Sequence, residues 1–157
     1  MSGLGQRGRG HSARYPATGT LPRVRERASA RLLLDTHVFL WLVGDDPRLS
    51  MTARRSLVAS DSELFLSTAS AWEIAIKTGL GRLTFNRDLE SFMADHLTAN
   101  RITPLPISLE HALYVGCLPD HHRDPFDRLL VAQCVLEGLA VVSGDRMMAK
   151  YGVEVVW

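Results

Sequence analysis

The sequence lacks the cysteine pattern of a zinc site or of a disulfide-rich secreted protein, because its only two cysteines, Cys117 and Cys134, stand far apart in apolar segments. We expect both to be small buried residues in a reducing compartment. No apolar run approaches the roughly 20 residues that span a membrane. The first 30 residues hold no hydrophobic segment of the signal-peptide kind. The sequence therefore predicts a cytoplasmic protein with no part in a membrane.

Charge is unevenly distributed along the 157 residues, although the formal net charge is only +1. Residues 1–31 contain seven arginines and one acidic residue, which leaves +6, whereas residues 32–157 contain eleven basic and sixteen acidic residues, which leaves −5. We therefore expect a disordered basic extension, residues 1–30, followed by one globular domain, residues 31–157. Three interpretations of the extension stay open: a nonspecific nucleic-acid contact, an unfolded tail, or a start site assigned too far upstream.

Short apolar runs alternate with helix-like patterns throughout the domain. Strands are predicted at residues 32–34, 64–67, 139–142 and 153–157, and an extended, proline-containing segment at 102–107 is predicted near a sheet edge. Helices are predicted at 37–43, 50–59, 70–79, 86–97, 108–117 and 125–136, with Asn86 as the cap of the fourth, and a short helix follows residue 145. Strands separated by helices favour an α/β fold with a mostly parallel central sheet.

Acidic residues stand where these strands end. Asp35 and Asp145 each follow a predicted strand. Glu73 lies about one turn into the helix after the strand at 64–67, and Asp127 lies in the first turn of the helix that starts at Pro125. Because the carboxyl ends of parallel strands share one edge of a sheet, these side chains are expected to converge. Carboxylates in such a cluster repel one another unless cations neutralise them, and oxygen ligands favour Mg²⁺ or Mn²⁺ over zinc. Asp35 is the predicted central ligand.

Divalent ions at this edge would lower the pKa of a bound water, hold a phosphodiester and stabilise charge on the attacking and leaving oxygens, so no protein nucleophile is required. Ser143 is placed to hydrogen-bond a carboxylate or a bound water, and Asp124 is a further candidate ligand. The side chains expected near phosphate groups are Lys77, Arg82, His122, Arg123, Arg128 and Arg146.

Each acidic residue also has a structural interpretation. Capping of the following helix would explain Asp35, Asp124 and Asp145. A favourable position in the first turn of a helix would explain Asp127, and an ion pair with the lysine four residues later would explain Glu73. The shared position at strand ends favours metal binding, since capping alone does not require the acids at one edge of the sheet.

Four segments, in this order, also resemble the PIN-domain ribonuclease toxins of the VapC kind: LLLDTH at 32–37, SAWEIAIK at 70–77, HRDPFDRLL at 122–130 and SGD at 143–145. The resemblance covers residues 31–157. It implies a three-layer α/β/α PIN-like fold and an endoribonuclease that depends on Mg²⁺ or Mn²⁺. It further implies a homodimer, RNA as substrate, and an antitoxin that inserts a segment near the acidic site and forms a hetero-oligomer with the toxin.

The resemblance assigns Asp35, Glu73, Asp127 and Asp145 to the acidic site and Ser143 to the family's hydroxyl position, and Asp124 matches a recurrent family position. The basic first 30 residues depart from the pattern, because these toxins usually begin almost at the first strand. The alternative is a noncatalytic Mg²⁺-binding regulatory or scaffold domain. A receiver-like version would need two adjacent acids after the first strand and a lone aspartate after a middle strand, and neither is evident.

Overall fold

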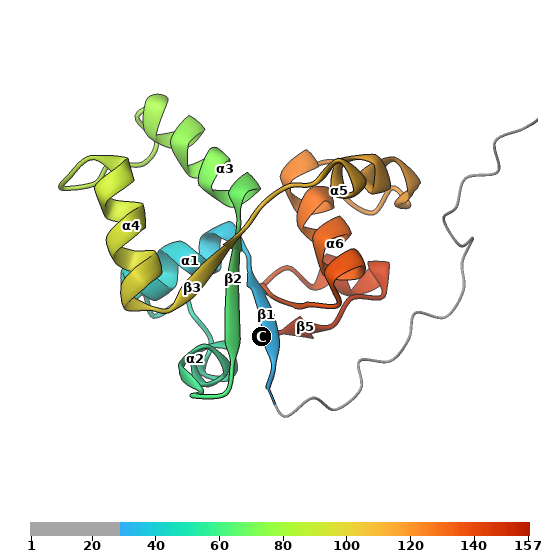
Figure 1. Cartoon of the computed structure of the whole chain (residues 1–157), viewed down its shortest axis with the longest axis horizontal. Helices are drawn as coiled ribbons and strands as arrows, with labels where there is room; N and C mark the ends of the chain where they lie inside the picture. Colours follow the sequence, from blue (N-terminus) through green and yellow to red (C-terminus); the bar gives the residue numbers. More distant parts are fainter. Residues whose placement is uncertain (1–28) are drawn as a thin grey trace, which may run out of the picture.

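The computed structural model describes residues 29–157, so the prediction of a disordered extension falls almost entirely outside the described residues. Strands and helices alternate along this part of the chain (Figure 1). The strands are β1 (Arg31–Leu34), β2 (Glu63–Ser67), β3 (Ile102–Leu105), β4 (Ala140–Val142) and β5 (Val155–Val156). The helices are α1 (Thr36–Val43), α2 (Met51–Val58), α3 (Thr68–Gly79), α4 (Leu89–Ala99), α5 (Leu109–Tyr114) and α6 (Pro125–Glu137), with 3-10 helices η1 (Val115–Cys117) and η2 (Arg146–Tyr151).

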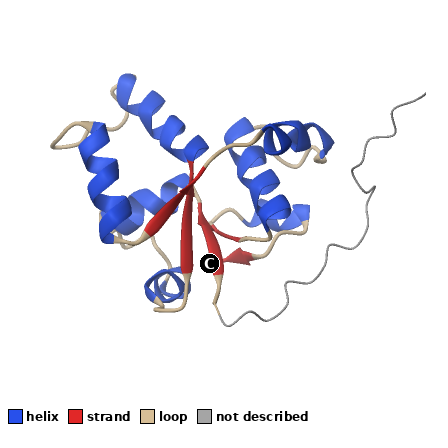
Figure 2. Cartoon of the chain, viewed as in Figure 1, coloured by secondary structure: helices blue, strands red, loops and turns tan. Residues whose placement is uncertain are grey.

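The strands form one sheet in the order β3-β2-β1-β4-β5, and every neighbouring pair is parallel (Figure 2). β1 is central, between β2 and β4, and the proline-containing β3 lies at an edge, where a residue without a backbone N–H is tolerated. The predicted parallel sheet is confirmed. Its consequence is that β1, β2 and β4 deliver the residues that follow them to the same edge.

Helices cover both faces of the sheet, so the domain has three layers, and apolar side chains pack between them. Leu32 and Leu34 of β1 pack in a core cluster with residues of α1, α2, α3 and α4. Leu33, between them, packs in a second cluster with residues of α6 and η2 on the opposite face. All three leucines are buried, as expected for a central strand covered on both sides. This rigid strand fixes the position of the residue that follows it, Asp35.

Most helix ends follow the predicted signals. Two differ in their bounds, because α3 starts at Thr68 after the cap Ser67 rather than near Ser70, and α5 ends at Tyr114 and continues as the 3-10 helix η1. The Ser108 hydroxyl accepts the backbone N–H of His111, and Gly138 ends α6 with a φ of 65°. The predicted Asn86 cap is wrong, because α4 is capped by Asp88, whose carboxylate accepts the N–H of Ser91. A carboxylate satisfies the free N–H groups at a helix start as well as an amide does, and it also suits the helix dipole.

Within residues 29–157, none of the helices has the length and apolar character needed to cross a membrane. Both cysteines are free thiols: Cys134 is buried in α6, as predicted, and Cys117 is exposed. The prediction of a buried Cys117 is wrong because this residue belongs to the surface turn η1 rather than to a packed helix.

Candidate metal centre

The four acidic residues Asp35, Glu73, Asp127 and Asp145, called here the acidic quartet, lie at the carboxyl edge of the sheet. Asp35 follows β1, Glu73 lies on α3 directly after β2, Asp127 lies on α6, and Asp145 follows β4 and precedes η2. Burial raises the pKa of Asp127, and the charges of Asp124 and of the other three quartet members add to this effect. Within residues 29–157, ligand atoms of Asp127 and Asp145 lie within 4.8 Å of one another and of His122, whereas Asp35 and Glu73 do not belong to this group. Asp35 is linked to the turn that carries Asp145 through Ser143.

Asp35 occupies the N-cap position of α1, yet its side chain makes no capping hydrogen bond. Instead, its Oδ2 accepts a hydrogen bond of 2.7 Å from the hydroxyl of Ser143. Ser143 is fully buried, and its Oγ also accepts the backbone N–H of Asp145 at 3.0 Å. The turn after β4 is therefore tied to the end of β1, and the carboxylate of Asp35 is oriented by a neighbouring strand rather than used as a helix cap.

Glu73 is held by two hydrogen bonds. Its Oε2 accepts the hydroxyl of Thr36 at 2.6 Å, and its Oε1 accepts Nζ of Lys77 at 2.6 Å in the ion pair anticipated from their spacing. Only 14% of the Glu73 side chain is exposed. The role of Thr36 was not found from the sequence, although its place directly after Asp35 was a usable signal. Lys77 balances one negative charge of the quartet.

The negative charge of Asp127 is unfavourable in the folded protein. Burial is the main cause that raises its pKa from the usual 3.8 to about 7, and repulsion by Asp124, Asp35, Asp145 and Glu73 adds to it. A carboxyl group with such a pKa keeps a proton on about half of the molecules at neutral pH. A cation that binds there would displace this proton, and the neighbouring carboxylates that raise the pKa would become its ligands.

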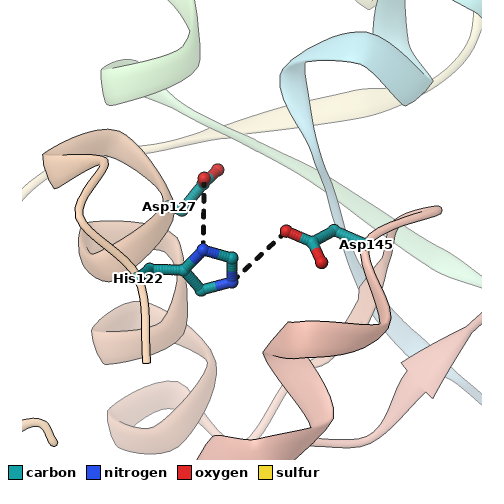
Figure 3. A group of neighbouring side chains, drawn as sticks. All are labelled: His122, Asp127 and Asp145. Carbon is teal, nitrogen blue, oxygen red and sulfur yellow. Dashed lines mark ion pairs between the residues drawn. The ribbon is translucent and has the colours of Figure 1, made fainter. Parts of the chain in front are cut away.

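Asp124 and Asp145 make the bonds of N-caps. Asp124 Oδ1 accepts the N–H of Phe126, and Asp145 Oδ1 accepts the N–H of Met147, both at 2.8 Å. The capping interpretation therefore describes both residues. For Asp145 it uses only one carboxylate oxygen, because Oδ2 faces the ring of His122 at 3.3 Å (Figure 3).

His122 lies between Asp127 and Asp145 (Figure 3). Its Nδ1 is 3.8 Å from Asp127 Oδ2, and one ligand atom from each of the three residues lies within 4.8 Å of the others. The ring is stacked on Tyr151 with an interplanar angle of 10°. Sequence reasoning placed His122 among the phosphate contacts and did not find this position, in which the ring faces the acidic quartet and is only 11% exposed.

The donor set at this edge fits a divalent cation. Its carboxylates repel one another, and the buried Nε2 of His122 has no hydrogen-bond partner among the described residues. A cation would relieve both conditions, since carboxylate oxygens and imidazole nitrogen are its ordinary ligands. The quartet is rich in oxygen donors, which suits Mg²⁺ or Mn²⁺.

The basic residues expected near phosphate groups occupy two kinds of position. Lys77 is paired with Glu73, and the Arg128 side chain, 13% exposed, donates to the backbone carbonyls of Val115, Leu118 and Pro119. Three arginines, in contrast, are exposed: Arg82, Arg123 and Arg146. A cavity of about 440 Å³ is lined by Asp120, His122, Arg123 and Arg128, and of these His122 also faces Asp127 and Asp145.

Comparison with known proteins agrees with this arrangement. The family model of the PIN domain matches residues 32–154, which include the whole acidic quartet. This chain belongs to the PIN-domain family. Within the family it is related to the VapC proteins: Ribonuclease VapC22 of Mycobacterium tuberculosis (strain ATCC 25618 / H37Rv) is 30% identical over 123 residues, which cover 76% of this chain and 91% of that protein.

Solved structures share the PIN-domain fold. VapBC2 from Rickettsia felis, bound to a DNA fragment from its promoter, matches with a TM-score of 0.61 and 14% identity over 80% of this chain and 96% of that chain. VapBC-1 from nontypeable Haemophilus influenzae matches with a TM-score of 0.57 and 15% identity over the same shares of the two chains. At these identities the likeness concerns the fold, and it confirms the predicted α/β/α architecture.

Proposed function

We propose that this PIN-domain protein is the ribonuclease toxin of a toxin–antitoxin pair and that it hydrolyses RNA phosphodiester bonds with a divalent cation. The observation that carries the proposal is that the members of the acidic quartet stand after strands or on the helices beside the carboxyl edge of the sheet, with Asp127 and Asp145 within 4.8 Å of each other and the pKa of Asp127 raised to about 7. The relationship to a protein named as a ribonuclease supports RNA as the substrate.

In this proposal the acidic quartet holds Mg²⁺ or Mn²⁺, with Asp35 as the central ligand. When bound, such an ion supplies the positive charge that activates water and stabilises the oxygens of the reacting phosphate. The chain itself supplies orientation. Ser143 directs Asp35, and Thr36 and Lys77 direct Glu73, so that three carboxylate oxygens are fixed before any ligand arrives.

The RNA backbone has to approach a domain whose described part is acidic. Exposed arginines near the site would offset this repulsion and orient phosphates. Arg123, next to His122 at the rim of the 440 Å³ cavity, and Arg82, in the turn after α3, are the proposed contacts. Lys77 and Arg128 stay candidates, although each already has partners inside the protein.

Apolar side chains on the surface support protein partners. Trp72 and Ile76 on α3 and Leu80, the residue directly after this helix, recur every four residues and are exposed, Trp72 by 60%. Leu109 and Leu113 are exposed on α5. We propose that a homodimer and a cytoplasmic antitoxin cover such surfaces. The two solved structures named above are VapBC assemblies, which supports a partner of the antitoxin kind.

The test is RNA cleavage by the purified full chain, freed of any partner, with EDTA, Mg²⁺ or Mn²⁺. Wild-type protein is expected to cleave only when a metal is added. Asp35→Asn should fold normally and lose the activity, whereas Asp61→Asn, which removes an exposed carboxylate from a turn, should keep it. Full activity of Asp35→Asn would refute the proposed site. A folded wild-type protein that binds Mg²⁺ and a protein partner but never cleaves RNA would favour the noncatalytic scaffold domain.

A further inference from the structure

The imidazole ring of His122 has the position of a ligand rather than of a surface contact. Nε2 lies 3.3 Å from Asp145 Oδ2, and Nδ1 lies 3.8 Å from Asp127 Oδ2 (Figure 3). Ligands about 2.0–2.2 Å from one ion are separated by up to about 4.4 Å. The ligand atoms of His122, Asp127 and Asp145 already lie within 4.8 Å of one another. Three ligands around one ion are closer than this on average, and side-chain shifts of less than about 1 Å would close a three-ligand site around a cation.

The segment that carries His122 is fixed in place by the rest of the fold. The backbone N–H of His122 donates a hydrogen bond of 2.7 Å to the hydroxyl of Tyr151, and the imidazole ring of His122 stacks on the same tyrosine. Its carbonyl accepts from Arg128 Nη1 at 3.3 Å, while Nη2 of the same guanidinium holds the carbonyls of Val115 and Leu118. The ring is thus oriented toward the acidic quartet before a cation arrives, which is the condition for a strong ligand.

The nitrogen that faces Asp145 is not satisfied by the protein. Nε2 of His122 is buried and has no hydrogen-bond partner among the described residues, even though Asp145 Oδ2 is 3.3 Å away, because the two groups are not aligned for a hydrogen bond. A buried polar atom without a partner is unusual in a folded protein. A cation held between the nitrogen and the carboxylate oxygens would provide the missing interaction.

We infer that His122 is a nitrogen ligand of the metal centre, together with Asp127 and Asp145, and that it shifts the selectivity of the site from Mg²⁺ toward Mn²⁺. Mg²⁺ strongly prefers oxygen ligands, whereas first-row transition metals accept imidazole nitrogen readily. The inference rests on the proposed function in that it deepens the description of the same site. It concerns which ion binds, and it can be tested without RNA.

The direct test is pulsed electron paramagnetic resonance of Mn²⁺ bound to the metal-stripped full chain labelled with ¹⁵N-histidine. Wild-type protein is expected to show a nitrogen coupling to Mn²⁺. His122→Ala should lose this coupling, and His121→Ala, which alters the adjacent exposed histidine, should retain it. Absence of a nitrogen coupling in wild type, or its persistence in folded His122→Ala, would overturn the assignment. If His122→Ala fails to fold, the assignment is tested by the wild-type spectrum and by Tyr151→Phe. This variant loses the hydroxyl that holds the His122 backbone and is expected to show a weaker nitrogen coupling.

Calorimetric titration measures the selectivity. His122→Ala is expected to weaken Mn²⁺ binding about tenfold or more and Mg²⁺ binding less than about threefold. Equal losses for both ions would contradict the inference. A wild type that cleaves RNA but has no nitrogen coupling defeats the inference and leaves the proposed function standing. A wild-type protein that shows the nitrogen coupling but does not cleave RNA defeats the proposed function and leaves the inference about His122 standing.

Discussion

Replacing Asp127 by asparagine should stabilise the metal-free protein, and it should do so more at high pH than at low pH. Burial and four neighbouring carboxylates raise the pKa of Asp127 from 3.8 to about 7. Between these two values the folded state binds more protons than the unfolded state, so the free energy of unfolding falls as the pH rises. Asparagine has a similar shape and carries no charge, so this loss is absent in the variant.

The size of the effect follows from the pKa of Asp127. A rise from 3.8 to about 7 corresponds to at most about 4 kcal/mol of destabilisation once the pH exceeds 7. Solvent screening reduces this figure because 28% of the side chain is exposed, and about half, or about 2 kcal/mol, is a reasonable expectation. At pH 5 the folded carboxyl group is still protonated and the loss is only partly developed. The advantage of asparagine should therefore be about 1–2 kcal/mol larger at pH 8 than at pH 5.

The assay is urea unfolding followed by circular dichroism, with EDTA present, for wild type and Asp127→Asn at pH 5 and pH 8. Asp61→Asn, which removes a charge from the exposed turn before β2, controls for the general effect of one fewer carboxylate. The gain in the free energy of unfolding of Asp127→Asn over wild type is the quantity compared. A gain that is equal at both pH values, or larger at pH 5, would refute a raised pKa of Asp127 in the folded protein.

Three further substitutions test parts of the account. Ser143→Ala should lower the free energy of unfolding by about 1–3 kcal/mol and reduce RNA cleavage. The reason is that the buried hydroxyl donates a hydrogen bond to Asp35 and accepts one from the backbone N–H of Asp145. Urea unfolding of the variant that matches wild type would contradict this. Thr36→Val should weaken Mg²⁺ binding about tenfold in calorimetry, since Glu73 loses the hydroxyl that orients it; unchanged affinity would exclude this role. Gly138→Ala should cost about 1 kcal/mol in urea unfolding, since its φ of 65° is strained for a residue with a Cβ, and cleavage by the folded protein should stay at the wild-type rate.

Much of the fold could be predicted because local signals and global packing agree. The run at 32–34 is too short for a helix and apolar throughout, which suits a central strand covered on both faces. Pro125 and Gly138 bracket α6 at the positions that proline and glycine favour. The cap of α4 was misassigned because Asn86 and Asp88 are both good caps and stand two residues apart, so the residue types alone do not select between them.

The positions of the acidic residues relative to the sheet could be predicted for a related reason. Position after a parallel strand fixes where a side chain lies, so Asp35 and Asp145 needed only the sheet to be placed together. His122 could not be placed in this way. Its position depends on two hydrogen bonds: the backbone carbonyl of His122 accepts from Arg128, and its backbone N–H donates to the hydroxyl of Tyr151. Neither contact follows from the periodicity of a helix or a strand, so the sequence pattern does not predict them. Arg128 was predicted to lie near phosphate groups, whereas its guanidinium donates hydrogen bonds to carbonyls of the loop that carries His122.

The identity of the nucleophile distinguishes metal-dependent hydrolysis from cleavage by the RNA itself, because a carboxylate cluster that holds a cation cuts RNA with water, without the 2′-hydroxyl of the substrate. The measurement is cleavage of a defined RNA by the wild-type chain with Mn²⁺ in H₂¹⁸O, followed by mass spectrometry of the products. We predict one ¹⁸O atom in the newly formed terminal phosphate of each cleaved strand, and no product with Asp35→Asn. A 2′,3′-cyclic phosphate without ¹⁸O, or labelled product of undiminished yield from Asp35→Asn, would contradict the account.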